Sequence, residues 1–181
     1  MKKYVIGLLM FSCFPAFSQS NGAKFEYIED YKKVVDSAGY DMATIRAIFG
    51  KGEITKRKKV EKVKGLKGGH FRSTEYSLKL YYPSLGITFQ SSSLIKVGLD
   101  TGEAIDVWSL RVSSIRFEKP FDKGTRNGIK IGSAVDEIIA KYPKDDIQVL
   151  PDSSVFYKST RMIFISSTST KKKKKVELIG L

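Results

Sequence analysis

Apolar side chains recur every three or four residues in three short stretches of this sequence, which predicts three amphipathic helices. The first stretch covers 23–39, and its apolar stripe consists of Phe25, Ile28, Tyr31, Val34 and Val35. The second begins after a predicted cap at Asp41 and stops at Gly50. Its apolar face consists of Met42, Ile45, Ile48 and Phe49.

The third helix is expected after a short strand at 128–131. Ser133 is predicted to cap it, because Asp136 follows three residues later as in a capping box. Its apolar face consists of Ala134, Val135, Ile138, Ile139 and Tyr142.

Apolar and polar residues alternate between and after these helices, which predicts strands. One set is expected near 74–82, 86–91, 94–99 and 104–118, and a second set near 153–158, 161–168 and 174–180. The parity of the alternation changes at Ser113 and Ser114, which predicts a bulge or a strand break there. The fold class expected is α+β, with short helices packed on one face of an antiparallel sheet. Whether the strands form one sheet or two is left open.

An internal duplication is predicted from two matched segments in the same order. Residues 42–54 align with 135–147, and residues 82–93 align with 157–168. The matched pairs include Ile45 with Ile138, Phe49 with Tyr142, Tyr82 with Tyr157, and Phe89 with Phe164. We therefore expect two repeats of a helix followed by an antiparallel meander, at 19–120 and 121–181. The first repeat has the longer connection, a basic insertion at about 55–72.

The stretch "GIKIGSAVDEIIAKYP", residues 128–143, resembles the signature of small bacterial envelope domains. These are the SmpA/OmlA outer-membrane lipoproteins and the β-lactamase inhibitory proteins, and the positions in register are Gly132, Ser133, Val135, Ile138 and Ile139. The resemblance implies short helices on an antiparallel sheet, in two tandem copies in the inhibitor. It also implies a binding or assembly role through the open face of the sheet rather than catalysis. The inhibitor family contains disulfides, which this chain lacks the cysteines to form.

The first residues, "MKKYVIGLLMFSCFPAFSQS", have the three parts of a secretory signal peptide at 1–18. Lys2 and Lys3 precede an apolar core that is too short to span a bilayer, and "AFS" forms a cleavage site. We expect an exported protein, periplasmic or extracellular, with no transmembrane span after cleavage. The alternative is a lipoprotein anchored to the outer membrane through Cys13, although the residues before it fit a lipobox poorly.

The residue inventory argues against several kinds of catalytic site. Cys13 is the only cysteine and His70 the only histidine, so a zinc site built from these residues is excluded. The tetrapeptide "SLIK" at 93–96 lacks the partner motifs of penicillin-recognising enzymes. No catalytic residue, metal or cofactor is expected. The alternatives are a small hydrolase with a site between the repeats, or a structural envelope lipoprotein.

The formal net charge of +13 is concentrated in two segments. Residues 51–72 hold nine basic residues against Glu53 and Glu61, and Lys171 to Lys175 form a run of five lysines. Such segments favour an envelope protein or an anionic lipid or lipopolysaccharide surface as partner. Nucleic acid is not expected, because an exported protein rarely meets it. The alternative is a pair of solvated hairpins whose lysines prevent strand pairing between molecules.

The candidate binding residues follow from this charge and from exposed aromatics. The basic candidates are Lys56, Arg57, Lys58, Lys59, Lys62 and Lys64. Tyr81 and Trp108 are the aromatic candidates, since both residue types are frequent in protein interfaces. Tyr81 and Tyr82 are adjacent in a strand, so at most one of them is expected in the core. The function expected is an exported, non-enzymatic binding module of the bacterial envelope.

Overall fold

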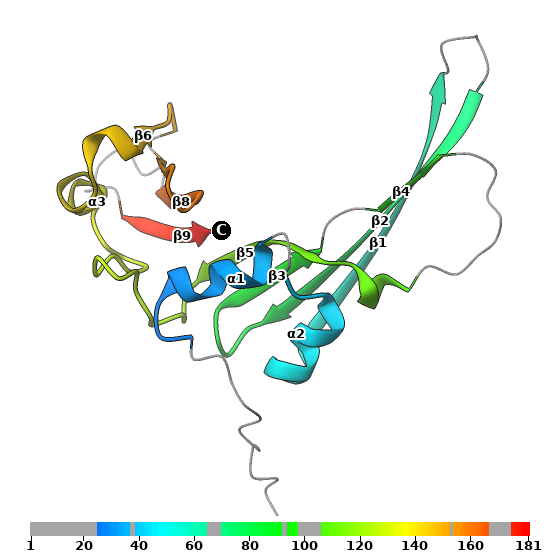
Figure 1. Ribbon diagram of the computed structural model, residues 1–181, viewed down its shortest axis with the longest axis horizontal. Coiled ribbons are helices and arrows are strands. Elements are labelled where there is room, and N and C mark those ends of the chain that lie inside the picture. Colours follow the sequence, from blue (N-terminus) through cyan, green and yellow to red (C-terminus); the bar gives the residue numbers. More distant parts are fainter. Residues whose placement is uncertain are drawn as a thin grey trace, which may run out of the picture.

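The computed structural model describes residues 25–36, 39–64, 70–91, 94–97, 106–152, 154–166 and 175–181 (Figure 1). Its first elements are η1 (Ile28–Tyr31), α1 (Lys32–Val35), α2 (Met42–Phe49), β1 (Glu53–Lys64), β2 (His70–Tyr82), β3 (Ile87–Ser91) and β4 (Leu94–Val97). The later ones are η2 (Val107–Ser109), β5 (Val112–Glu118), α3 (Val135–Lys141), η3 (Lys144–Asp146), β6 (Ile147–Val149), β7 (Val155–Tyr157), β8 (Met162–Ser166) and β9 (Val176–Gly180). The predicted signal peptide with Cys13, and Lys171 to Lys174, lie outside the described residues.

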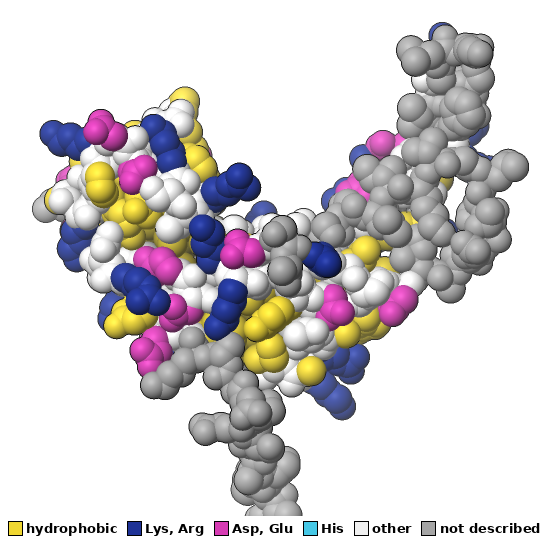
Figure 2. All heavy atoms as spheres, in the orientation of Figure 1, with side chains coloured by type: hydrophobic (Ala, Val, Ile, Leu, Met, Phe, Trp, Pro, Cys, Tyr) yellow, Lys and Arg dark blue, Asp and Glu magenta, His cyan; other side chains and the backbone are white. Residues whose placement is uncertain are grey.

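All the strands belong to one antiparallel sheet with the order β1-β2-β3-β5-β9-β8-β7-β6, and β4 pairs with β2 beyond this path. The α+β class is therefore confirmed, and the sheet is one rather than two. Figure 1 shows the sheet curling upward at both ends, with the β1–β2 hairpin as one arm and the β6–β8 region as the other. The space-filling view shows a hollow between the arms (Figure 2).

Helices α1, α2 and α3 all cover the same side of the sheet. They lie there because three phenylalanines that must be kept from water project from this side. Phe89 pairs with Ile115, two residues before Phe117, and Phe117 is linked to Phe164 through Ile179. Directly opposed residues and residues two apart in a strand project to the same side. All three phenylalanines are at most 1% exposed. The helices leave the opposite side of the sheet uncovered (Figure 1).

Aromatic contacts join each helix to its part of the sheet. Tyr31, in η1 just before α1, meets Phe117 edge-on at 5.0 Å between ring centroids. In α2, the ring of Phe49 lies 5.7 Å from Tyr82 and 5.1 Å from Phe89.

Tyr142, just after α3, makes aromatic contacts with β7 and β8. Its ring lies 4.4 Å from Tyr157 and 5.8 Å from Phe164. These contacts belong to a single hydrophobic core that runs through both halves of the sheet.

The structure confirms the predicted cap of one helix and corrects that of another. The Asp41 carboxylate accepts a hydrogen bond from the Thr44 amide at 2.7 Å, and Gly50 ends α2 with a φ of 81°. The prediction that Ser133 caps α3 is wrong: the N-cap is Ala134, which makes no side-chain capping bond. The Ser133 hydroxyl instead accepts from the Lys130 amide at 3.1 Å, because the preceding chain turns back on itself.

The predicted strands need three corrections. The stretch 128–131 is not a strand but part of an irregular connection. Residues 107–109 form the 3-10 helix η2, in which the Asp106 carboxylate accepts from the Trp108 amide at 3.0 Å. Strands β1 and β6 were not predicted. The bulge is confirmed, since Gln90 pairs with Ser114 and Ser91 with Val112, which leaves Ser113 unpaired in the register.

Within the part of the chain that the structure covers, no helix is both long and apolar enough to cross a membrane.

Candidate binding surfaces

The β1–β2 hairpin sorts its charged residues onto two sides. The strands pair without interruption from Glu53 opposite Tyr81 to Lys64 opposite His70. Opposed residues share a side, so the even-numbered residues of both strands lie on one side and the odd-numbered residues on the other. The even side continues the row of Leu78 and Leu80, which are buried beneath the helices.

We call the even side beyond the core the cationic side. Its charged residues are Lys56, Lys58, Lys62, Lys64 and Arg72, all exposed. No aspartate or glutamate occupies an even position of β1 or β2. Two exposed apolar side chains lie in the same row, Ile54 at 45% and Val60 at 53% exposure. The Lys58 ammonium lies 5.5 Å from the centroid of the Tyr76 ring, a favourable cation–π contact.

The odd side carries a balanced set of charges, and we call it the mixed side. Its charged residues are Glu53, Arg57, Lys59, Glu61, Glu75 and Lys79, three acidic and three basic. Lys59 and Glu61 form an ion pair at 2.5 Å. The mixed side therefore holds no excess charge, although it lies on the same two strands.

The six basic residues predicted from the sequence are thus divided between the two sides. Lys56, Lys58, Lys62 and Lys64 lie together on the cationic side, whereas Arg57 and Lys59 lie on the mixed side. Arg72, which also lies on the cationic side, was not among the predicted binding residues. The division of charge between the two sides was visible in "EITKRKKVEKVK", where both glutamates fall on odd positions. It becomes readable only once this segment is known to be a strand, since alternation separates sides only in extended chain.

A second surface lies on the uncovered side of the sheet, on β7, β8 and β9. We call it the apolar patch, and it consists of Phe156, Ile163, Ile165 and Leu178. Phe156 is opposite Ile163, and Ile165 is opposite Leu178. Ile165 is 37% exposed and the other three are half-buried. No helix of the described chain packs over these residues, in contrast to Phe164 on the other side.

Tyr81 lies on the uncovered side of the sheet, next to the buried Tyr82, as expected for adjacent strand residues. Its partial burial, together with the carboxylates of Glu118 and Glu53, raises the pKa of Tyr81. Trp108 lies beside α2, where the Arg46 guanidinium covers its ring at 4.8 Å. The two aromatic candidates therefore do not form one surface.

One cavity lined by described residues opens on the helix side and has a volume of about 390 Å³. Aromatic rings of Phe25, Tyr31, Phe49 and Phe121 line it, together with Ser84, Asp122 and Lys123. Burial, with a contribution from the carboxylates of Asp122 and Asp30, raises the pKa of Tyr31 far above its ordinary value. The polar side-chain groups of this cavity's lining residues are the hydroxyls of Ser84 and Tyr31, one carboxylate and one amine.

Another cavity, of about 350 Å³, is lined by Lys119, Ile131, Gly132, Lys175, Val176 and Glu177. Its side chains offer two amines and one carboxylate. Among the residues with described positions, no group of three or more His, Cys, Asp or Glu side chains could hold a metal ion.

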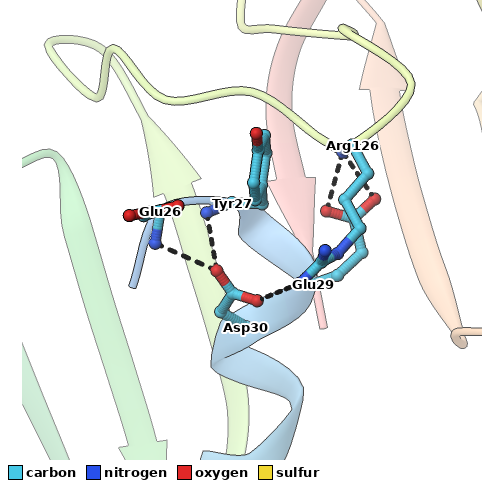
Figure 3. Close-up of polar contacts among 5 residues, drawn as sticks. All are labelled: Glu26, Tyr27, Glu29, Asp30 and Arg126. Carbon is cyan, nitrogen blue, oxygen red and sulfur yellow. Dashed lines mark hydrogen bonds and ion pairs between the residues drawn. The ribbon is translucent and has the colours of Figure 1, made fainter. Parts of the chain in front are cut away.

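A polar clasp fastens the connection between β5 and α3 to the first helical turn (Figure 3). The Arg126 amide donates to both oxygens of Glu29 at 3.0 Å, and its guanidinium contacts Asp30 at 2.6 Å. Asp30 also accepts from the amides of Tyr27 and Glu26. Partial desolvation alone would raise the pKa of Asp30, but these hydrogen bonds outweigh it and hold the pKa below its ordinary value. The clasp fixes one half of the molecule against the other.

Comparison with known proteins gives no relative for this chain: no protein-family model, no curated protein and no solved structure matches it.

Proposed function

We propose that this chain is an exported, non-enzymatic binding module of the bacterial envelope, built from two copies of a helix followed by a four-stranded meander. Its uncovered sheet side would take a protein partner, with the apolar patch as the central contact. The observation that carries the proposal is this patch of four apolar side chains on a sheet side that bears no helix.

The strand order supports the two copies. It reads β1-β2-β3-β5 and then β9-β8-β7-β6, so two meanders run outward from a central pair. The aromatic contacts repeat as well, with Phe49 on Tyr82 and Phe89 in one half and Tyr142 on Tyr157 and Phe164 in the other. These are the pairs that the sequence alignment matches. Ile45 and Ile138, also matched, are both fully buried.

The two proposed copies differ most in their first hairpins. Strands β1 and β2 have 12 and 13 residues, whereas β6 and β7 have three each. The extra length corresponds to the basic insertion at about 55–72. A lengthened hairpin on one copy supports a function that the shared framework does not supply.

A protein partner is supported by the chemistry of the uncovered side. Protein interfaces combine an apolar centre with a polar rim. The apolar patch has such a rim along the neighbouring strands, where Glu118 is opposite Leu178 and Arg116 is opposite Gly180. Half-buried side chains in a preformed sheet also lose little conformational freedom on binding, which favours association.

The envelope location rests on the signal-like sequence at 1–18 and on the resemblance of residues 128–143 to envelope domains. Two alternatives follow from particular residues. A lipoprotein would carry its anchor on Cys13. A hydrolase would have to work with the hydroxyl of Ser84 and the charges of Asp122 and Lys123 in the cavity on the helix side.

Site-specific photo-crosslinking in intact cells tests the protein partner. Ile165 is replaced by p-benzoylphenylalanine, which reaches partners within contact distance of the apolar patch. Glu137, exposed on α3 on the opposite side of the sheet, is replaced in a matched control. We expect a discrete crosslinked species from position 165 that is absent from position 137. Equal crosslinking at both positions, or none at position 165, would refute a partner on the uncovered side.

A further inference from the structure

We infer that the cationic side of the β1–β2 hairpin docks on an anionic lipid surface, through lysines that meet phosphate headgroups and apolar side chains that meet the layer beneath them. The inference deepens the proposed function, because it supplies the envelope surface on which an exported module would be held. It concerns a different side of the molecule from the apolar patch.

The first argument is the segregation of charge. The cationic side carries four lysines and one arginine with no acidic residue, whereas the mixed side of the same strands carries three acidic and three basic residues. Both sides are solvated to a similar degree, since nearly every described residue of β1 is exposed. A hairpin that needed lysines only for solubility would have no reason to gather the uncompensated ones on one side.

Protection of the sheet edge does not explain this segregation either. β1 is an edge strand, and charged side chains on an edge discourage pairing with another molecule. An approaching strand would meet both sides of β1 equally, so lysines on either side protect the edge. The sorting of charge by side therefore points to a surface that meets only one side of the hairpin.

The geometry suits an extended anionic plane better than a single phosphate. Successive residues on one side of a strand are about 7 Å apart, so the row from Lys56 to Lys64 extends over about 27 Å. The right-handed twist of a two-stranded ribbon turns this row gradually into a continuous stripe. Four of the five cations are lysines, whose ammonium groups act as point charges, whereas specific phosphate pockets favour the arginine fork.

The apolar members of the row match the layer beneath the headgroups. Val60 is exposed between the lysines, and Ile54 is exposed at the end of the row nearest the core. Lysine stems can lie along apolar surface while their ammonium groups stay at the level of the phosphates. An acidic protein partner would be matched by the charge but would not require exposed valine and isoleucine in the same row as the cations.

The placement of the cationic side leaves the uncovered sheet side free. The cationic side faces the same way as the helix-covered side, because its row continues into Leu78 and Leu80 of the core. The hairpin forms one arm of the molecule (Figure 1), so its outer side can lie against a surface without closing the hollow. A lipid surface and a protein partner can therefore be bound together.

Vesicle co-sedimentation of the full mature chain tests this inference. Vesicles of phosphatidylcholine alone are compared with vesicles that also contain phosphatidylglycerol, each at low and high salt. The test variant is K56Q/K58Q/K62Q, on the cationic side. The matched control is R57Q/K59Q/K79Q, which removes the same number of charges from the mixed side of the same hairpin. Thermal unfolding of each variant verifies that the fold is retained.

We expect the wild type to bind only the anionic vesicles, with affinity that falls as salt rises. Each cation near an anionic membrane contributes about fivefold in affinity, so the test variant should bind on the order of 100-fold more weakly. The control should stay within a few-fold of the wild type. Equal weakening of both variants would show that net charge alone acts, and would overturn the inference.

Two further outcomes would also overturn it. One is failure of the wild type to bind anionic vesicles at low salt. The other is side-dependent binding to soluble polyglutamate without binding to vesicles, which would assign the cationic side to an acidic protein. Crosslinking through position 165 of the wild type tests the proposed partner separately. If the lipid test fails and crosslinking succeeds, only this inference is removed. If crosslinking fails and the lipid test succeeds, only the proposed partner on the uncovered side is removed.

Discussion

Among the described glycines, Gly86 is the one at which an added Cβ would meet the closest atom. Its φ is 63°, and a Cβ there would lie 2.1 Å from the Glu118 carbonyl oxygen and 2.6 Å from the Phe121 amide nitrogen. Gly50 has a comparable φ of 81°, but a Cβ there would have nothing within 4 Å. A side chain at Gly50 would therefore carry only the cost of a positive φ, whereas a side chain at Gly86 would also carry the cost of a close contact.

We predict that Gly50→Ala lowers the free energy of unfolding by about 1–3 kcal/mol, because its φ of 81° and ψ of −155° lie in a region that almost only glycine adopts. Gly86→Ala should lower it by more, because the Glu118 and Phe121 backbones must also move. Urea denaturation of the two variants measures the difference. Equal losses would mean that the contact between Gly86 and the end of β5 is easily relaxed.

At the scale of single residues, the sequence predicts what depends on near neighbours. The cap of α2 at Asp41 and the opposite directions of Tyr81 and Tyr82 could both be predicted, since each is a local property of the chain. The close approach at Gly86 could not, because residues 118–121 come from a distant segment. Ser133 was assigned to the wrong role for a different reason: residues 130–133 form a turn rather than the expected strand, so its hydroxyl accepts from the Lys130 amide.

At the scale of elements, Asp41 caps the start of α2, and the titration of its carboxylate makes the stability of that helix depend on pH. Hydrogen bonds from the Thr44 hydroxyl and amide lower the pKa of Asp41 below its ordinary value. Because the folded-state pKa lies below the unfolded value, the stabilisation is fully present above the unfolded pKa. It is lost as pH falls through the folded pKa. We predict that Asp41→Ala lowers the free energy of unfolding by about 1 kcal/mol at neutral pH, and by less in acid.

Asp41→Asn is the matched variant, because asparagine caps helices about as well as aspartate but does not titrate. It should keep nearly the wild-type stability at neutral pH and lose less of it on acidification. Urea denaturation across the acidic range measures both variants. If Asp41→Asn lost stability in acid as steeply as the wild type, other carboxylates would account for the pH dependence.

The strands divide into those that the hydrophobic pattern reveals and those that it does not. The bulge at Ser113 was predicted because the parity of buried residues changes there. β1 was missed because its exposed positions show no apolar alternation, and it is held as a strand by pairing with β2 along its whole length. Residues 107–109 have strand-like alternation, but the Asp106 carboxylate stabilises a turn by binding the Trp108 amide. Side-chain hydrogen bonds of this kind compete locally with the sheet.

At the scale of the whole molecule, one core runs through both halves, so they should unfold together. Phe164 lies in the second half and is 1% exposed, while Trp108, the only tryptophan, packs against the same core in the first half. We predict that Phe164→Ala lowers the free energy of unfolding by about 3–5 kcal/mol. Trp108 fluorescence should report this shift as fully as circular dichroism does.

Ile165→Ala is the control, because this neighbour projects to the uncovered side and is 37% exposed. It should change stability much less than Phe164→Ala. A Trp108 transition that stays in place while circular dichroism shifts would mean that the halves unfold independently, each with its own core.

The joining of the halves was the part of the architecture that the sequence left open. Helix and strand patterns predict each half separately, because each pattern is local. The single sheet depends on three residue pairs between β5 and β9, from Arg116 with Gly180 to Glu118 with Leu178. Two hydrogen bonds between Ile115 and Leu181 extend this seam. Nothing in the alternation of either strand specifies which other strand lies beside it.

The central position of β9 has a consequence for the order in which the sheet can assemble. Val176–Gly180 follow the other described strands in the sequence, yet they lie between β5 and β8 in the middle of the sheet. Strands β1, β2, β3 and β5 can pair with one another without β9, but nothing else brings β8 against β5. The two groups of strands therefore become one sheet only when β9 has paired with both of its neighbours.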